Sequence, residues 1–342
     1  MKIVVLAGGI STERDVSLSS GTKVYKALKK NGHQVLILDV FLGYPSQDWN
    51  EIFDKDQDWA KEIGAVKEEV PDLELVKAMR PDWEKHYFGP HVIEICQMAD
   101  VVFMALHGEN GENGKIQAYF DLMGIRYTRT DYASSAIAMN KSIAKDIFGY
   151  HKIPTPAGIT LKKGEPVRKI AYPCVVKSCS GGSSVGVSLV QNDEEFDKAL
   201  EEAFRYDQEA VIEEYIPGRE FSVGVMEGRA LPVIEISPKQ GFYDYKNKYQ
   251  AGSAIEICPA QISDEKTKQL QEIAEKVFMA LRLKSYARMD FRMNDAGEVF
   301  CLEANTLPGL TPTSLLPEEA AAEGTSYEQL CEQIIQAAFH KS

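Results

Sequence analysis

The sequence lacks the features that would tie it to a membrane or to nucleic acid. The apolar run in its opening MKIVVLAGG stops at two glycines, which is too short for a signal-peptide core. No later run approaches the roughly 18 apolar residues that a membrane-spanning helix needs. The net charge is −13, and no long cluster of Lys and Arg interrupts the acidic balance. We therefore expect neither a membrane nor a nucleic acid as a partner.

Cysteine motifs and the common nucleotide signatures are also missing. None of the six scattered cysteines forms a Cys-x-x-Cys pair, which argues against a zinc site. We expect these cysteines to be reduced and buried, in a cytoplasmic protein. The glycines after the first apolar run do not form Gly-x-Gly-x-x-Gly. The glycine-rich loop after Lys177 is not a P-loop, because its lysine precedes the glycines.

In its first third the chain alternates strand and helix patterns. Apolar runs at residues 2–6, 33–40 and 101–106 predict strands, and helical periodicity at 16–30 and 116–123 predicts helices. This alternation implies an open, mostly parallel α/β sheet. Ligands then gather at the carboxyl ends of its strands.

The remainder predicts an α+β architecture. Strands are expected at residues 173–178, 184–190, 210–215, 220–226, 230–236, 288–293 and 299–303, and helices at 133–150, 194–206, 265–283 and the C-terminus. We expect an N-terminal α/β domain over residues 1–132, in which the aperiodic residues 41–90 are an inserted surface excursion. Two further parts, 133–217 and 218–342, follow it.

A candidate metal site lies on two strands joined by Asn-Asp-Ala-Gly, a hairpin-turn composition. Alternation places Arg288 and Asp290 on one face of the first strand. It places Glu303 and Asn305 on one face of the second. Oxygens from Asp290, Glu303 and Asn305 suit Mg²⁺, which takes a few carboxylates together with phosphate oxygens. The alternative is a solvent-facing polar surface on which Arg288 only pairs with the acids.

A candidate phosphate site lies in the loop Lys-Ser-Cys-Ser-Gly-Gly-Ser-Ser-Val-Gly, which begins at Lys177. Small residues let backbone N–H groups approach phosphate oxygens, and the lysine adds positive charge. Lys141, expected near the centre of the helix over 133–150, is a second candidate phosphate contact. The alternatives are a flexible hairpin tip for the loop and an ordinary surface lysine at Lys141.

Further polar residues stand at the ends of predicted strands. Glu213 and Glu214 close a strand and can serve adenine and ribose, although adjacent acids there are commonly just solvated. Glu13 opens the first helix, where it can cap the helix or attract a substrate ammonium group. His107 and Glu112 lie in a glycine-rich loop at the carboxyl end of a strand, where parallel sheets place their sites. A single histidine there is more often structural.

These pieces, in this order, resemble the D-alanine–D-alanine ligases of the ATP-grasp superfamily. The resemblance runs from Met1 to about Leu316 and is broken mainly at residues 41–90. The most specific stretches are Gly-Gly-x-Ser-x-Glu-Arg-x-Val-Ser from Gly8, Ala-Leu-His-Gly-x-x-Gly-Glu from Ala105, Gly-Ser-Ser-Val-Gly from Gly182, Phe-Tyr-Asp-Tyr-x-x-Lys-Tyr from Phe242 and Glu-Ala-Asn-Thr-x-Pro-Gly from Glu303. The implied fold is an N-terminal open parallel α/β domain followed by a two-part ATP-grasp nucleotide clamp.

The resemblance implies roles for single residues at the nucleotide. The phosphates of ATP would be held by Lys141, Lys177 and the backbone at Ser183 and Ser184, the adenine by Glu213, Glu214 and Ile216, and the ribose by Glu220. Two magnesium ions, which Mn²⁺ can replace, would be held by Asp290, Glu303 and Asn305.

It also implies roles at the amino acids. The first D-alanine would be bound by Glu13, His107 and Glu112, with Ser183 linking Glu13 to Tyr249, and the second by Ser314 and Leu315. The oxyanion would be stabilised by Arg288 and the Gly309 backbone, and the transferred phosphate would be approached by Lys248.

The implied activity is the ATP-dependent joining of two D-alanines through a D-alanyl phosphate, which supplies D-alanyl-D-alanine for peptidoglycan synthesis. A polar lid over residues 237–250 would keep water from the acyl phosphate, and a cytoplasmic homodimer is expected. One alternative is a ligase that joins D-alanine to D-serine or, less in keeping with the retained Tyr249, to D-lactate. The other is a nucleotide-binding relative without activity.

The sequence departs from the family pattern at three places. Arg129 stands where the family usually has glycine, Asn140 where it has an acid, and Ser178 where it has proline. None of these changes removes a catalytic group, so we expect them to alter only local geometry.

Overall fold

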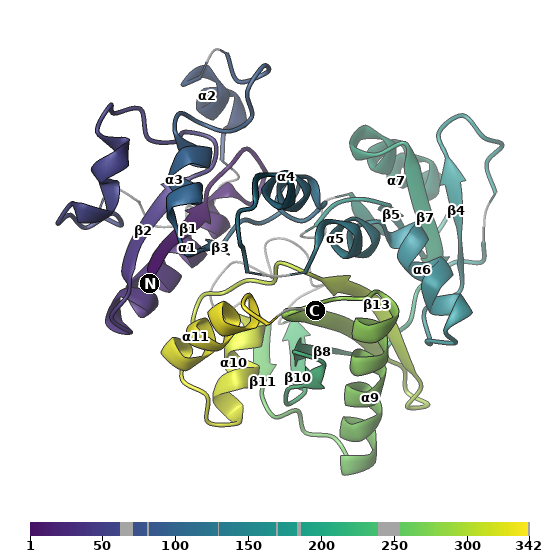
Figure 1. Cartoon of the computed structure of the whole chain (residues 1–342). Coiled ribbons are helices and arrows are strands. Elements are labelled where there is room, and N and C mark those ends of the chain that lie inside the picture. The colour runs from purple at the N-terminus through teal and green to yellow at the C-terminus, as the bar shows by residue number, and fades with distance from the viewer. Residues whose placement is uncertain are drawn as a thin grey trace. The chain divides into compact units, whose positions relative to one another are not determined.

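The computed structural model describes residues 1–61, 71–80, 82–128, 130–168, 170–182, 186–238 and 254–340. The chain forms two compact units, whose elements are labelled in Figure 1. The first unit comprises Met1–Tyr132, Lys284–Tyr286 and Leu307–Ser342, and the second comprises Ala133–Leu283 and Ala287–Thr306. No helix in the described part of the chain combines the length and apolar character needed to cross a membrane.

A three-stranded parallel sheet forms the centre of the first unit. β1 (Lys2–Ala7) lies between β2 (Gln34–Asp39) and β3 (Val101–Met104), as the alternating pattern predicted. The strands are almost uninterrupted apolar runs because both faces of the sheet are buried. α1 (Arg14–Lys30) packs on one face, where Gly21 allows a close approach to the strands.

Further helices of this unit lie before and after β3 and at the C-terminus. α3 (Val92–Met98) and α4 (Lys115–Met123) share an apolar core with the strands. The chain ends in α10 (Leu315–Ala322) and α11 (Tyr327–Ala337), and α11 is the expected terminal helix. A capping box begins α11, in which the Ser326 side chain accepts a hydrogen bond from the Gln329 N–H.

The described part of the excursion over residues 41–90 contains two short helical segments. They are a 3₁₀ turn, η1 (Trp49–Asp54), and α2 (Leu73–Ala78). Asp72 begins α2 by accepting hydrogen bonds from the N–H groups of Glu74 and Leu75. Apolar side chains of the excursion, Ile52 and Phe53 among them, join the core of the sheet.

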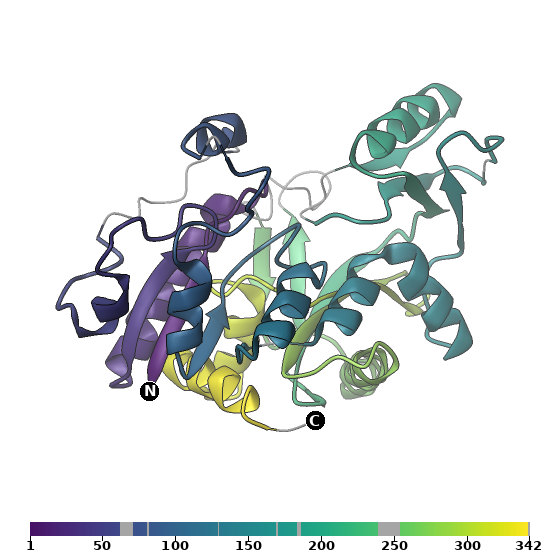
Figure 2. The same cartoon turned by 45° about the horizontal axis from the view of Figure 1, so that its top comes forward.

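A four-stranded antiparallel sheet forms one part of the second unit. Its order is β4 (Gly158–Lys162), β7 (Glu209–Glu214), β5 (Cys174–Ser178) and β6 (Val187–Val190). α7 (Asp193–Tyr206) lies against this sheet, as Figure 2 shows from a second side, and its apolar residues share a core with the strands. The sequence did not predict β4.

A second sheet belongs to the same unit. Its strands, in order, are β11 (Ala254–Ile257), β10 (Ile234–Pro238), β8 (Arg219–Met226), β12 (Tyr286–Met293) and β13 (Val299–Asn305), with β9 (Arg229–Ala230) paired to β8. α9 (Asp264–Ala280) packs on this sheet. The strand predicted over 230–236 is split into β9 and β10, and β11 was not predicted.

The helix predicted over 133–150 is interrupted. α5 (Tyr132–Met139) ends before Asn140, and α6 (Lys141–Tyr150) begins after it. The Asn140 backbone is extended, and its side chain accepts a hydrogen bond from the Ile143 N–H, which caps α6. Lys141 therefore opens a helix and does not lie at the centre of one.

The cysteines are free, as expected. Five of the six are buried, and Cys258 is partly exposed.

A turn between the two sheets predicts a large effect of one methyl group. Gly218 has φ +129°, and a Cβ there would lie 2.1 Å from the Met293 carbonyl oxygen. Because the obstacle is backbone, we expect Gly218→Ala to lower the free energy of unfolding by at least ~2 kcal/mol. Denaturant unfolding followed by circular dichroism measures this loss.

Gly228 is the matched control. It has φ +84°, and nothing lies within 4 Å of its Cβ position. Gly228→Ala therefore introduces backbone strain without a clash, and it should lower the free energy of unfolding by about 1 kcal/mol. Equal losses in the two variants would contradict the steric account.

Candidate active site

The predicted hairpin forms and sets its polar residues opposite each other. In the antiparallel pair β12–β13, Asp290 faces Glu303 and Arg288 faces Asn305. The connecting turn ends at Gly297, which has φ 77°. Directly opposed side chains of two strands lie on the same face of a sheet. The period-two prediction is confirmed, and the four residues share one polar surface.

Asp290 is the centre of this group. Arg288 donates to both of its oxygens, from Nε at 2.9 Å and from Nη2 at 2.8 Å. Ser222 Oγ and Asn305 Nδ2 each donate to it at 2.9 Å. The pairing of Arg288 with an acid, the alternative interpretation of this surface, is therefore present. These donors satisfy a carboxylate that is only 7% exposed.

The donor atoms on this surface fit a magnesium ion. Asp290, Glu303 and Asn305 offer carboxylate and amide oxygens, the hard ligands that Mg²⁺ takes in proteins. No three His, Cys, Asp or Glu side chains gather as a metal site anywhere in the described residues. A magnesium ion here would thus depend on the Asn305 amide and on oxygens from a bound phosphate.

Buried lysines reach the same region from other elements. Lys141 Nζ donates to the Gly181 carbonyl in the glycine-rich loop at 2.8 Å and lies 3.3 Å from Glu303 Oε2. Lys177, on β5, pairs with Glu213 at 2.5 Å. Lys145, one helical turn after Lys141, holds the other oxygen of Glu213 at 2.8 Å. Because the ammonium groups of Lys145 and Lys177 surround the single carboxylate of Glu213, the three side chains together carry a net positive charge.

Burial and charge compete within this group, which we call the lysine–glutamate triad (Lys145, Lys177 and Glu213). Burial lowers the pKa of Lys177, but Glu213 and Glu303 outweigh it and the net pKa is raised. Burial raises the pKa of Glu213, but Lys177 and Lys145 outweigh it and the net pKa is lowered. Burial prevails at Lys145, whose pKa is lowered despite Glu213. Lys177 and Glu213 thus form a charged pair at neutral pH.

The residues predicted to meet adenine and ribose lie where β7 ends and β8 begins. Glu214 accepts a hydrogen bond from the Ala157 N–H at 2.8 Å. Ile216 is buried, and its carbonyl accepts from Arg292 Nε at 3.1 Å. Arg292 also pairs with Glu220 at 3.2 Å. Arg292 therefore holds this end of both strands in place.

In the first unit, Glu13 ends the glycine loop that follows β1. Its side chain lies against Gly108, where a Cβ would be 2.9 Å from Glu13 Oε2. Ser11 donates from Oγ to the His107 carbonyl at 2.7 Å and accepts from the Glu13 N–H at 3.3 Å. The structure thus joins the two loops in which Glu13 and His107 were predicted as site residues.

The His107 ring is held through both of its nitrogens. Nδ1 donates to the Leu307 carbonyl at 2.9 Å, and Nε2 lies 3.1 Å from Ser20 Oγ. These contacts fit the structural role that the sequence left open, and they also fix the ring within the loop. Glu112 closes the same loop, since its N–H donates to the Gly108 carbonyl at 3.0 Å.

Gly309 and Ser314 lie in one turn before α10. A Cβ on Gly309 would lie 2.9 Å from Ser314 Oγ, and Ser314 Oγ accepts from the Thr311 N–H at 3.1 Å. Leu315 is the buried first residue of α10, so its backbone N–H stands at a helix N-terminus, where anions are favoured.

Several predicted residues lie outside the described part of the chain. They are Ser183, Ser184, Lys248 and Tyr249, together with Arg129 and the predicted lid beyond Pro238.

Three residues of the site were not predicted. Lys145 follows Lys141 at the helical repeat, and Arg292 continues the alternation of Arg288 and Asp290, so both carried a periodic signal. Ser222 carried none, because it reaches Asp290 from another strand.

Removing the charge of Glu213 should destabilise the second unit. Glu213→Gln leaves buried Lys177 and partly buried Lys145 without their carboxylate, and we expect a loss of ~3–5 kcal/mol in the free energy of unfolding. Glu209→Gln, on the same strand, breaks a pair with Lys162, which is 66% exposed, and should cost less than ~1 kcal/mol. Similar losses in both variants would contradict a special role for the triad.

The same carboxylate predicts a pH dependence. The folded-state pKa of Glu213 lies below its unfolded value of about 4.3, so its stabilisation is present above that pH and is lost as the pH falls through the folded-state pKa. The difference in stability between the wild type and Glu213→Gln should hold from pH 7 to about 5 and narrow below about pH 4. A difference that grew on acidification would contradict this sign.

Comparisons with known proteins identify the family. Models of the "D-ala D-ala ligase N-terminus" and "D-ala D-ala ligase C-terminus" match residues 2–130 and 157–336. The D-alanine–D-alanine ligase of Pediococcus pentosaceus is 45% identical, over 98% of this chain and 97% of its own. That of Lacticaseibacillus casei is 44% identical, over 98% of this chain and 95% of its own.

Solved structures agree. The D-alanine–D-alanine ligase from Bacillus anthracis complexed with ATP matches with a TM-score of 0.74 at 29% identity, covering 99% of this chain and 97% of that chain. The VanG D-Ala:D-Ser ligase from Enterococcus faecalis matches with a TM-score of 0.75 at 28% identity, covering 98% and 99%. These likenesses confirm the predicted fold class, a parallel α/β part followed by a two-part ATP-grasp clamp. The chain therefore belongs to the D-alanine–D-alanine ligase family.

Proposed function

We propose that this chain uses ATP to join two molecules of D-alanine, supplying D-alanyl-D-alanine for peptidoglycan synthesis. One observation carries the proposal: buried Lys141 and Lys177 reach the surface where the β12–β13 hairpin presents Asp290 and Glu303. Cations and hard oxygen ligands side by side suit a nucleotide bound with its metal. Relatives 44–45% identical to the chain carry the name D-alanine–D-alanine ligase.

The nucleotide would lie against the second unit. Lys141 and Lys177 supply positive charge for the phosphates, with the Ser183 and Ser184 backbone closing over them. The strand end at Glu213, Glu214 and Ile216 serves the adenine, and Glu220 serves the ribose. Arg292 supports this assignment because it fixes both Ile216 and Glu220 from one guanidinium group.

Magnesium would be held by Asp290, Glu303 and Asn305. When bound, it neutralises phosphate charge, and two ions are expected, with Mn²⁺ able to replace them. The hydrogen bonds from Arg288 and Ser222 fix the Asp290 carboxylate in advance of binding.

The amino acids would be bound mainly by the first unit. Glu13 accepts the ammonium group of the first D-alanine, in a site completed by His107, Glu112 and the Ser183–Tyr249 link. The turn with Gly309, Ser314 and Leu315 offers hydrogen-bond donors to the carboxylate of the second. We assign residues 1–132, with their insertion at 41–90, to substrate binding, and 133–217 and 218–342 to the two parts of the clamp.

The reaction runs in two displacements. A carboxylate oxygen of the first D-alanine attacks the γ-phosphorus, ADP leaves, and a D-alanyl phosphate forms. The neutral amine of the second D-alanine then attacks the carbonyl carbon, the C–O bond to phosphate breaks, and the nitrogen gives up one proton as the amide forms. Arg288, oriented by Asp290, and the Gly309 N–H would stabilise the oxyanion, while Lys248 approaches the transferred phosphate. Loss of one such donor typically raises the barrier by about 3 kcal/mol.

The setting follows from the chemistry. Because the acyl phosphate hydrolyses in water, we assign the lid over residues 237–250 to water exclusion. We place the reaction in the cytoplasm, with which the free cysteines agree, and expect the enzyme to be a homodimer.

The second substrate can be tested directly. With ATP and magnesium, purified protein should release phosphate with D-alanine alone, and D-serine or D-lactate as second substrate should yield at least about tenfold less mixed product at neutral pH. Mass spectrometry of the dipeptides measures the ratio. Preferential formation of D-alanyl-D-serine would reassign the second substrate, and no phosphate release with any D-amino acid would refute the ligase.

The metal assignment predicts a change in magnesium dependence. Glu303→Gln removes one charged ligand, so the magnesium concentration for half-maximal activity should rise roughly tenfold or more. Glu298→Gln is the control, because Glu298 lies at the far end of the hairpin and contacts Asn294 in the turn. An unchanged magnesium requirement in Glu303→Gln would contradict its role as a ligand.

A further inference from the structure

The two ends of the excursion over residues 41–90 meet each other within the first unit. Tyr44 N–H donates to the Pro90 carbonyl at 2.8 Å, and Gly89 N–H donates to the Val40 carbonyl at 2.9 Å. A Cβ on Gly89 would lie 2.4 Å from the backbone nitrogen of Gly43. The two ends of the excursion are therefore pressed together backbone to backbone.

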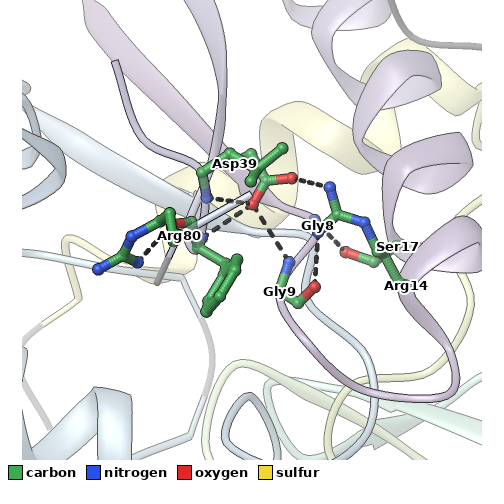
Figure 3. Close-up of polar contacts among 8 residues, drawn as sticks. Gly8, Gly9, Arg14, Ser17, Asp39 and Arg80 are labelled. Carbon is green, nitrogen blue, oxygen red and sulfur yellow. Dashed lines mark hydrogen bonds and ion pairs between the residues drawn. The ribbon is translucent and has the colours of Figure 1, made fainter. Parts of the chain in front are cut away.

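Arg80, inside the excursion, strengthens this closure. Its Nη1 donates to the carbonyls of Phe41, at 2.5 Å, and Tyr87, at 3.0 Å, and its Nη2 donates to that of His86 at 2.5 Å. The guanidinium also lies 4.8 Å over the Phe41 ring, and Arg80 is only 8% exposed. One buried cation thus ties the two ends of the excursion together. Figure 3 draws Arg80 with one of these contacts.

Asp39, the last residue of β2, lies beside the start of the excursion. Its Oδ1 accepts from the N–H groups of Phe41 at 2.8 Å and Leu42 at 3.0 Å, which begin the excursion. The same oxygen accepts from the Gly9 N–H at 3.4 Å, and Oδ2 pairs with Arg14. Figure 3 shows this carboxylate between the excursion and the glycine loop.

The glycine loop before Glu13 is braced from this side. Arg14 Nη1 donates to the Gly9 carbonyl at 2.5 Å. The backbone N–H of Gly9 is thus held by Asp39 and its carbonyl by Arg14. Gly8 has φ +75°, and a Cβ there would lie 2.4 Å from Asp39 Oδ2, which only glycine permits. Ser17 Oγ accepts from the Gly8 N–H at 2.9 Å and completes the brace.

The excursion touches the loop at a second place. A Cβ on Gly9 would lie 3.4 Å from the Tyr87 hydroxyl oxygen. The side chain of Asn110, in the loop that carries His107 and Glu112, also interacts with that hydroxyl. Tyr87, whose carbonyl Arg80 holds, therefore lies beside both the loop before Glu13 and the loop that carries His107.

We propose that Asp39, through Arg14 and Gly9, is a positioning residue that holds the Glu13 loop for the first amino acid and couples it to the 41–90 excursion. The inference rests on the proposed role of Glu13. Glu13 directly precedes Arg14, and Arg14 N–H donates to the Ser11 carbonyl at 3.1 Å, so any movement of Arg14 moves the turn that carries Glu13. On this proposal, the excursion helps to hold the substrate-binding loop in place.

Asp39→Asn tests the proposal, with Asp100→Asn as the matched control. Asp100 accepts from the Lys2 N–H at 2.7 Å and so caps the same sheet at its opposite end. In Asp39→Asn we expect the KM for the first D-alanine to rise about tenfold, with the KM for ATP unchanged. Asp100→Asn should leave both constants as in the wild type.

Hydrogen–deuterium exchange supplies a readout that does not depend on catalysis. Peptides covering Gly8–Ser17 should exchange at least about tenfold faster in Asp39→Asn than in Asp100→Asn. Arg14→Lys, which keeps the charge but not the planar fork, should show the same pattern in KM and exchange.

The outcomes separate the inference from the function it rests on. If the wild-type protein forms no dipeptide from D-alanine, the proposed function fails, whatever the variants show. An unchanged D-alanine KM in Asp39→Asn, unchanged exchange of the loop, or an equal rise in the KM for ATP would each overturn the positioning role.

Discussion

The antiparallel register of β12 and β13 is the constraint on which the rest of the site depends. It sets Asp290 opposite Glu303 and Arg288 opposite Asn305, so that two acids, an amide and a guanidinium group meet on one face. A slip of one residue would turn each side chain to the other face, where Met289 lies in the apolar core. The same two strands thus supply both a polar surface for chemistry and the packing that holds it rigid.

Cations are brought to this surface from separate elements, and each is held before any ligand arrives. Lys141 opens α6 because Asn140 caps that helix, and its ammonium group lies between the glycine-rich loop and Glu303. Lys177 is kept charged inside the protein by Glu213. Groups fixed in this way need little rearrangement when a phosphate chain binds, which is the condition for electrostatic catalysis.

Much of this could be predicted from sequence, because strand alternation and turn composition are local. The hairpin, its facing acids and the glycine-rich loop follow from patterns within a few residues. The predictions that failed depended on individual side-chain hydrogen bonds that no periodic pattern records. Helical periodicity runs through Asn140, and only its side-chain hydrogen bond to the Ile143 N–H reveals the break. Ser222 and Arg80 act across long sequence separations, and the excursion has no period that would point to its contacts with Asp39.

The central claim is that the chain activates a D-alanine carboxylate by phosphorylation. D-Alanine labelled with ¹⁸O in its carboxylate tests this claim most directly, because the oxygen that attacks the γ-phosphorus stays with phosphorus when the amide forms. The account predicts that each phosphate released during dipeptide synthesis carries one ¹⁸O atom from D-alanine. Unlabelled phosphate formed together with the dipeptide would contradict it.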